Sequence, residues 1–131
     1  MNMAIIKFEN IRIKTSAPSV SITSYGTIGF NGGAVKKFDM HNYKRCLLYC
    51  DPDEKKIYIE LTNDENDKSS LLFRHRNPGA DIGAKSFFVF FDNMPSDLTH
   101  YPIEIGEKEN MFIIDMTKGT ARKKKVKSQE S

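Results

Sequence analysis

Alternating apolar and polar residues recur along most of the chain and predict a body made mainly of strands. Residues 3–14, 20–24 and 56–61 alternate, and 45–50 is a nearly continuous apolar run. Alternation is typical of a strand that buries one face, and a continuous apolar run of a strand buried on both faces. The turn signal at Asp51-Pro52-Asp53 predicts that 45–50 and 56–61 form a hairpin, because Pro presets φ and Asp bonds its own backbone.

Two short helices are predicted between the strands. The first covers 32–39 and is capped by Asn31. The second runs from 82 to about 91 with Asp81 as its cap, although the aromatic run 86–91 also fits a buried strand. Further strands are expected at 27–30, 71–75, 101–105 and 111–116. The fold class predicted from the pattern is therefore mainly β with two short helices.

The chain repeats this order of elements once. Phe38-Asp39 and Phe91-Asp92 end the two predicted helices at an offset of 53. We therefore expect one β-rich domain over 1–117, within which the repeat outlines halves at 20–62 and 71–116. One interpretation is that these halves derive from an internal duplication. The alternative is that the two halves resemble one another only because β-rich domains repeat strand, turn and strand.

Composition and charge separate a body from a tail. The 131 residues are 39% hydrophobic and include nine Phe and five Tyr, which is enough for one core. Residues 118–131 hold six Lys or Arg and one acid, so their formal charge is +5. The whole chain has a formal net charge of +3, so the other residues together carry −2. We expect this tail to be disordered, and either to contact phosphates or to act as a solubilising end.

Several classes of protein are excluded or disfavoured. No apolar run reaches the roughly 18–20 residues that cross a bilayer, and the first nine residues do not resemble a secretory signal. Cys46 and Cys50 are four residues apart on a predicted strand, too far for a disulfide. His41, His75 and His100 lack metal-ligand spacing. We expect free thiols in a reducing, cytoplasmic setting, and neither metal nor cofactor.

No catalytic motif is present, so we expect no enzyme activity. The chain has no nucleophile elbow, no phosphate-binding loop ending in Lys-Ser/Thr and no metalloprotease signature. Glycines cluster around Asn31 and either cradle an anion or allow a tight bend. His75, between Arg74 and Arg76, is a candidate for phosphate contact, with a solvated strand end as the alternative.

Cationic side chains form three groups that are candidates for phosphate contact. They are Lys36, Lys37, Lys44 and Arg45 around the first helix, Arg74 and Arg76 on a later strand, and Arg122, Lys123, Lys124 and Lys125 in the tail. If the two halves stack, these groups are expected to share one face. The alternative is that Lys36 and Lys37 are only the exposed side of an amphipathic helix.

The first half also resembles a known family. The residues that carry the likeness are 22–30, 34–40, 47–49 and 56–59. Within 21–61 they resemble the AbrB/MazE/SpoVT swapped-hairpin pattern of strand, Gly turn, strand, short helix and hairpin. The resemblance implies a small β-barrel that binds DNA, and related cradle-loop barrels fuse two copies, with 71–116 as the second. Members usually have Pro before the helix, where this chain has Asn31-Gly32-Gly33.

Two functional hypotheses follow. The first is a non-enzymatic protein that binds DNA or RNA, such as a small transcriptional regulator. The alternative is a protein-interaction or structural accessory module, host- or phage-encoded, that pairs through exposed strand edges with a protein partner or in a homo-oligomer.

Overall fold

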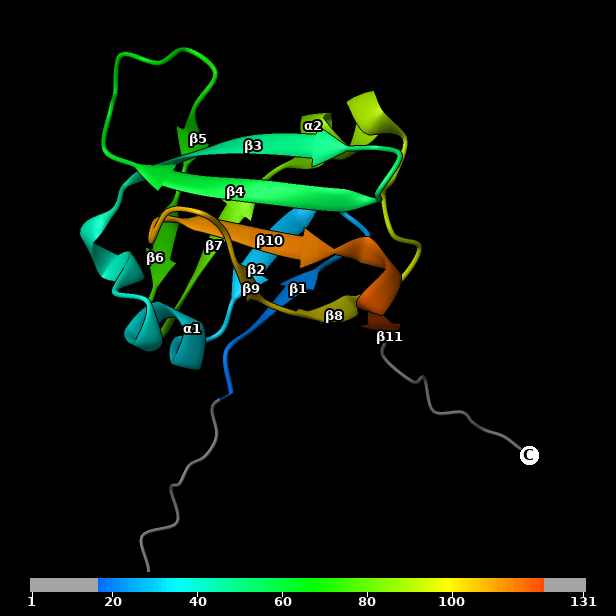
Figure 1. Ribbon diagram of the computed structural model, residues 1–131, viewed down its shortest axis with the longest axis horizontal. Coiled ribbons are helices and arrows are strands. Elements are labelled where there is room, and N and C mark those ends of the chain that lie inside the picture. The colour runs from blue at the N-terminus through cyan, green and yellow to red at the C-terminus, as the bar shows by residue number, and fades with distance from the viewer. Residues whose placement is uncertain (1–16, 122–131) are drawn as a thin grey trace, which may run out of the picture.

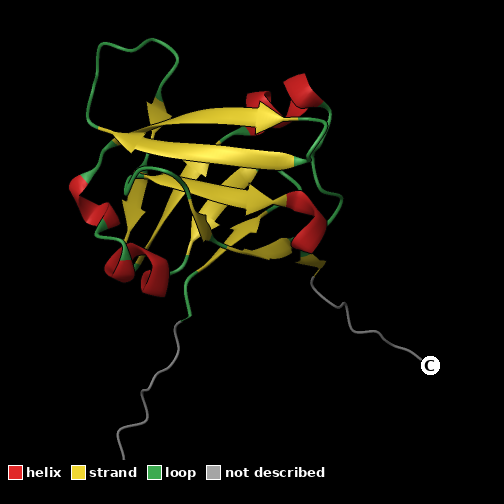
Figure 2. Cartoon of the chain, viewed as in Figure 1, coloured by secondary structure: helices red, strands yellow, loops and turns green. Residues whose placement is uncertain are grey.

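The computed structural model describes residues 17–121, which form two facing antiparallel sheets (Figures 1 and 2). The six-stranded sheet has the order β11 (Thr120–Ala121), β8 (Thr99–Pro102), β1 (Ser19–Ile22), β2 (Thr27–Phe30), β7 (Gly79–Gly83) and β6 (Arg74–Arg76). The five-stranded sheet has the order β5 (Leu71–Leu72), β3 (Arg45–Asp51), β4 (Lys56–Thr62), β10 (Met111–Asp115) and β9 (Glu104–Ile105). A mainly β fold with two short helices is thus confirmed.

The core lies between the sheets because each long strand turns alternate side chains inward. The inward side chains of the central strands are fully or almost fully buried, and they include Val20, Ile22, Ile28, Phe30, Ile57, Ile59, Leu61, Ile82, Phe112 and Ile114. Burying each such side chain contributes about 1.5–3 kcal/mol. The outer faces of both sheets are left to residues at the alternate positions.

Both helices are shorter than predicted. Helix α1 (Gly32–Lys37) begins at its Asn31 cap as expected, and Asp39 at φ 52° ends it before the 3-10 turn η2 (Met40–Asn42). The predicted start of the second helix was wrong, because Asp81 lies in β7 and α2 covers only Lys85–Phe91. Alternation continues through Ala80 and Ile82, whose burial against β2 holds this segment in the sheet.

The hairpin of 45–50 and 56–61 is confirmed as β3 and β4. Two other predicted strands are each divided between the sheets. Residues 71–75 form β5 and β6 on either side of buried Phe73, and 101–105 form the end of β8 and all of β9 on either side of half-buried Ile103. At each corner one apolar residue points into the core while the chain passes from one sheet to the other.

The strand pairs do not join the two sheets into a ring, so the closed barrel stays a prediction.

The predicted tail starts too early, because Lys118 ends the 3-10 turn η3 (Met116–Lys118) and Thr120 pairs with His100 in β8. Gly119 permits this path, since a Cβ there would lie 2.5 Å from the Tyr101 ring. The predicted strand at 3–14 and the rest of the tail lie outside the described residues. None of the helices within 17–121 is long and apolar enough to cross a membrane.

Candidate nucleic-acid interface

A continuous polar row crosses the outer face of the six-stranded sheet. The strand registers place one residue of each strand side by side, in the order Arg74, Asp81, Gly29, Ser21, His100 and Thr120. Neighbouring strands are about 4.8 Å apart, so six strands make a face roughly 24 Å wide. We call this set of residues the cross-strand row.

The middle of the row is built from small residues. A Cβ at Gly29 would lie 3.2 Å from the Ser21 hydroxyl, so a larger residue would crowd the neighbouring strand. A shallow hollow of about 170 Å³ lies here, lined in part by Ser19, Asn31 and His100. An extended polyanion can therefore approach the backbone closely at the centre of the face.

Two guanidinium groups converge on one carboxylate at the β6 edge. Arg74 Nε donates to Asp81 Oδ1 at 2.7 Å, Arg74 Nη2 lies 2.7 Å from the same oxygen, and Arg76 Nε lies 3.2 Å from Asp81 Oδ2. The arginine side chains remain 42% and 59% exposed. Asp81 cancels one of the two positive charges and holds both groups in place, which reduces the entropy lost on binding an anion.

Sequence reasoning missed an aromatic and a lysine beside this edge. Tyr25, at the tip of the β1–β2 hairpin, is 79% exposed. With Arg74, Lys85 and Gly26 it lines an open groove of about 740 Å³. The sequence feature that could have identified Tyr25 is the Tyr25-Gly26 turn, because a side chain next to a turn glycine points to solvent. In the structure Gly26 has φ 89°, as such a turn requires.

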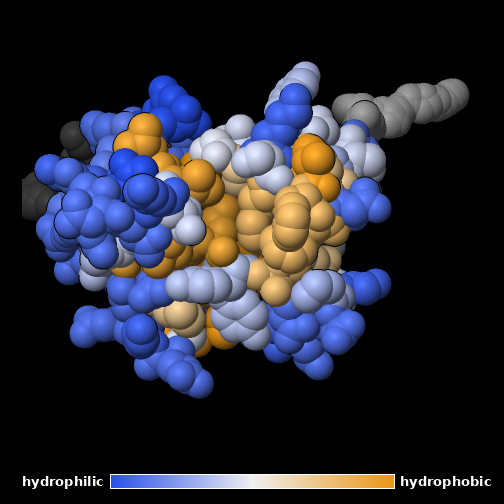
Figure 3. Space-filling model, turned by 90° about the horizontal axis from the view of Figure 1, so that it is seen from above, coloured by the Kyte–Doolittle hydropathy of each residue, from blue (hydrophilic) through white to orange (hydrophobic). Residues whose placement is uncertain are grey.

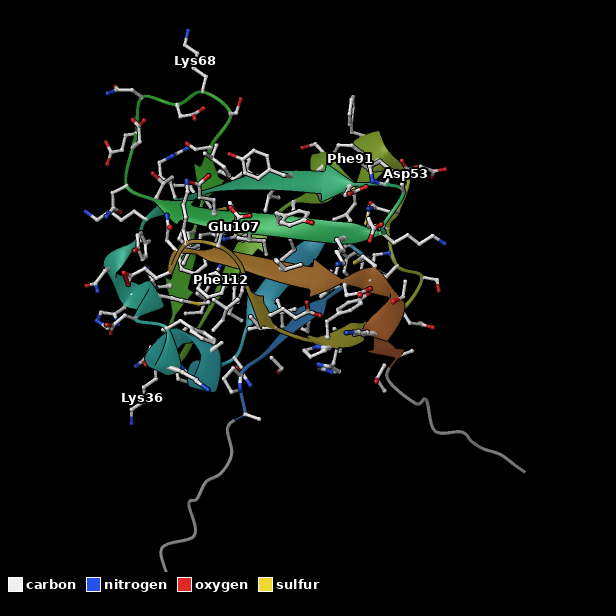
Figure 4. The ribbon with its side chains drawn as sticks, viewed as in Figure 1. Lys36, Asp53, Lys68, Phe91, Glu107 and Phe112 are labelled. Carbon is white, nitrogen blue, oxygen red and sulfur yellow. The ribbon has the colours of Figure 1, made fainter. Side chains whose placement is uncertain are left out.

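The first-helix lysines lie at one end of the two sheets rather than on the row. Lys36 and Lys37 are both exposed on α1, and Figure 4 shows Lys36 pointing away from the body. Lys36 lines an open groove of about 750 Å³ together with His41 and Asn77, just beyond β6. This groove places Lys36 next to the β6–β7 turn.

The expectation that all three cationic groups share one face was wrong. Arg45 donates from Nε to Ser70 Oγ at 2.6 Å and from Nη2 to Ser70 O at 3.1 Å, and it lies on the five-stranded sheet. Lys44 is exposed just before it. Arg45 therefore fixes the loop after β4, because its guanidinium is already bonded there.

His75 is also engaged within the fold. Its Nε2 lies 2.7 Å from the Tyr43 carbonyl oxygen, which accepts a hydrogen bond when that nitrogen carries the proton. The ring also packs edge-on against Phe73. Of the Arg74-His75-Arg76 triplet, the two arginines are thus the groups directed to the outer face.

The cysteines are free thiols of different exposure. Burial raises the pKa of the Cys46 thiol to about 12, and burial with the nearby Asp51 charge raises the pKa of Cys50. Both remain protonated near neutral pH, which makes them poor nucleophiles. Between Ala17 and Ala121, no group of three or more His, Cys, Asp or Glu side chains is placed to hold a metal ion.

The chain matches no protein-family model, no curated protein and no solved structure.

Proposed function

We propose that this protein binds nucleic acid through the outer face of its six-stranded sheet. The observation that carries the proposal is the cross-strand row, which connects the Arg74 and Arg76 edge with β11 at the opposite edge. Arg122, Lys123, Lys124 and Lys125 follow β11 directly in the sequence. One predicted group of cations therefore lies at one edge of this polar face, and another follows in sequence the strand that forms the opposite edge.

The chemistry of this face favours phosphate contact over base stacking. The aromatic side chains of its strands, Phe30 and Tyr101, are turned into the core and are 3% and 5% exposed. Arginine forks and small polar residues suit phosphate oxygens, which are the same for any sequence. The binding should tolerate many sequences of DNA or RNA, with Tyr25 offering one stacking site at the rim.

The charge distribution makes this binding strongly dependent on salt. Residues 17–121 hold twelve Lys or Arg and fifteen Asp or Glu, a formal charge of −3, so the rest of the chain carries +6. The described body cannot attract a polyanion at long range, and attraction depends on local cations and on the residues outside it. Lys36, Lys37 and Lys44 extend the cationic surface past β6, whereas Arg45 makes no direct contact.

A non-enzymatic role inside the cell, as a small regulator, fits this proposal, and it agrees with the AbrB-like pattern of the first half. The free thiols Cys46 and Cys50 are consistent with a reducing compartment. A closed barrel is not required, since one sheet face supplies the whole interface.

The test is a salt series of fluorescence anisotropy with a labelled 20-nucleotide single strand and the matching duplex. We expect wild-type affinity to fall steeply as KCl rises. For the duplex, Arg76→Gln should lower the slope of log K against log salt by about 0.9, the amount expected for one phosphate contact. Changing Arg122, Lys123, Lys124 and Lys125 together to Gln should lower the slope further.

Lys108→Gln is the matched control, because Lys108 is an exposed lysine paired with Glu60 on the five-stranded sheet. It should leave the slope unchanged. Absence of binding at low salt would contradict the proposal, and so would an equal effect of the Arg76 and Lys108 substitutions.

A further inference from the structure

Helix α2 forms a second surface, which is apolar where the cross-strand row is polar. Its sequence is Lys-Ser-Phe-Phe-Val-Phe-Phe, and only Phe88 is buried. Val89 and Phe90 are 62% and 80% exposed. Figure 3 views this side of the molecule and shows apolar side chains across the middle of the face. Large exposed apolar groups that gather in one place mark a binding surface.

An open strand edge lies on the same side. β3 pairs with β4 along its whole length, but β5 covers its other edge only at Arg45 and Cys46. Residues 47–51 therefore have no neighbouring strand on that edge within the described part of the chain. Such an edge presents backbone N–H and C=O groups that an extended segment can pair with.

The residues that follow α2 contact β3 at the Cys50 side chain, within the stretch that has an open edge. Asn93 Nδ2 lies 3.9 Å from Cys50 Sγ, and a hollow of about 360 Å³ is lined by Cys50, Phe91, Asp92 and Asn93, among others. The buried Asn93 Oδ1 has no hydrogen-bond partner among the described residues. Figure 4 shows Phe91 and Asp53 at this same end of the molecule. An incoming strand at this end of β3 would therefore meet Phe91 at the end of α2.

Acidic side chains surround the two ends of the open edge. The β3–β4 turn over 51–55 holds three acids and one lysine, and Asp92, which ends α2, lies beside this turn. At the other end, the loop over 63–70 holds three acids and one lysine. This rim favours a basic segment over an acidic one.

We propose that an extended segment of a partner protein, with alternating apolar and basic residues, adds to β3 as a further strand. Its backbone pairs with residues 47–51. Its inward apolar side chains pack on Val89, Phe90 and Phe91, and its basic side chains face the acidic rim. This docking surface meets the nucleic-acid face at Val89, which lines the same groove as Tyr25 and Arg74. Its other parts lie on β3 and at the end of α2, and the proposal does not depend on nucleic-acid binding.

The experiment uses the full chain labelled with ¹⁵N and two capped peptides, Lys-Val repeated four times and Glu-Val repeated four times. We expect only the Lys-Val peptide to shift the amide signals of residues 47–51 and α2, and to slow exchange at the free-edge amides of β3 by about tenfold or more. Val89→Gln with Phe90→Gln should weaken this binding by about tenfold, an effect typical of losing aromatic anchors. Lys36→Gln with Lys37→Gln on α1 is the control and should not change it.

Three outcomes would overturn the proposal. One is that neither peptide, or both equally, shifts these amides. Another is that the Val89 and Phe90 substitutions leave binding unchanged while the two-dimensional spectrum shows the fold intact. The third is that the same amides shift when the protein alone is concentrated, since a second copy would then be the occupant.

Discussion

The two short helices occupy corresponding places in the two halves and differ in what they expose. At an offset of 53, buried Val35 corresponds to buried Phe88, and Asp39 at φ 52° corresponds to Asp92 at φ 53°. The two exposed positions between them are Lys36 and Lys37 in α1 but Val89 and Phe90 in α2. Both helices thus share this buried position and a left-handed residue at or just after the helix end. Neither shared feature requires apolar side chains at Val89 and Phe90.

The strand order extends this comparison to the whole body. Hairpins β1–β2 and β6–β7 lie side by side in one sheet and pair through β2 and β7, and hairpins β3–β4 and β9–β10 lie side by side in the other and pair through β4 and β10. An internal duplication predicts this arrangement and stays a hypothesis. On that hypothesis, the helix of the first copy, α1, has a cationic exposed face, and the helix of the second copy, α2, has an apolar exposed face.

The largest expected effect comes from removing the buried residue of α2. Phe88→Ala deletes a fully buried ring at the top of the core, and we expect the free energy of unfolding to fall by about 3–5 kcal/mol. Val35→Ala, at the corresponding position of α1, should cost clearly less because fewer buried atoms are removed. Urea unfolding followed by circular dichroism measures both, and equal losses would contradict the comparison.

The start of α2 depends on a glycine in the neighbouring hairpin. Ala84 N donates to Gly26 O at 2.9 Å, and a Cβ at Gly26 would lie 2.6 Å from Lys85 Cα. Gly26→Ala should therefore lower the free energy of unfolding by about 1–3 kcal/mol, from the clash and the positive φ together. An unchanged urea midpoint would show that the hairpin does not hold the helix.

The start of α1 depends instead on a side-chain cap. Asn31 Oδ1 accepts from Ala34 N at 2.9 Å, and its Nδ2 donates to Ala17 O at 2.8 Å. Asn31→Ala should cost about 0.5–2 kcal/mol, the usual range for a lost N-cap. Hydrogen exchange should show the loss first at α1, while the amides of α2 keep their protection.

The smallest effect is expected at the left-handed ends of the helices. Asp39→Gly and Asp92→Gly each place at positive φ the residue that adopts it without strain, so each should stabilise the fold by up to about 1 kcal/mol. The two gains should be similar if the helix ends are equivalent. A gain at one and a loss at the other in thermal unfolding would show that they are not.

Local signals predicted the fold where the partner of a segment is its neighbour in sequence. The β3–β4 hairpin followed from alternation and the Asp51-Pro52 turn. The division of 71–75 and 101–105 between two sheets did not follow, because it depends on which distant strand each part meets. Asp81 was taken for a helix cap because its cross-strand partner, Arg74, cannot be recognised from spacing alone.

The candidate site was likewise predicted only where the signal lies in neighbouring residues of the sequence. Arg74 and Arg76 were identified from the sequence, since clustered cations need no structure to be noticed. Their connection to Ser21 and His100 was not, because membership of one row follows from five strand pairings in register. The loss of Arg45 from the group depends on a bond to Ser70, twenty-five residues away.

The central claim is that the outer face of the six-stranded sheet contacts nucleic acid, while the end of α2 and the open edge of β3 do not. The most direct test is to titrate the ¹⁵N-labelled full chain with an unlabelled 20-nucleotide strand at low salt and follow its amide signals. We predict shifts in β6, β7, β2, β1 and β8, with those of Phe90, Phe91 and residues 47–51 unmoved. Shifts confined to α2 and β3, or no shift anywhere, would contradict the account.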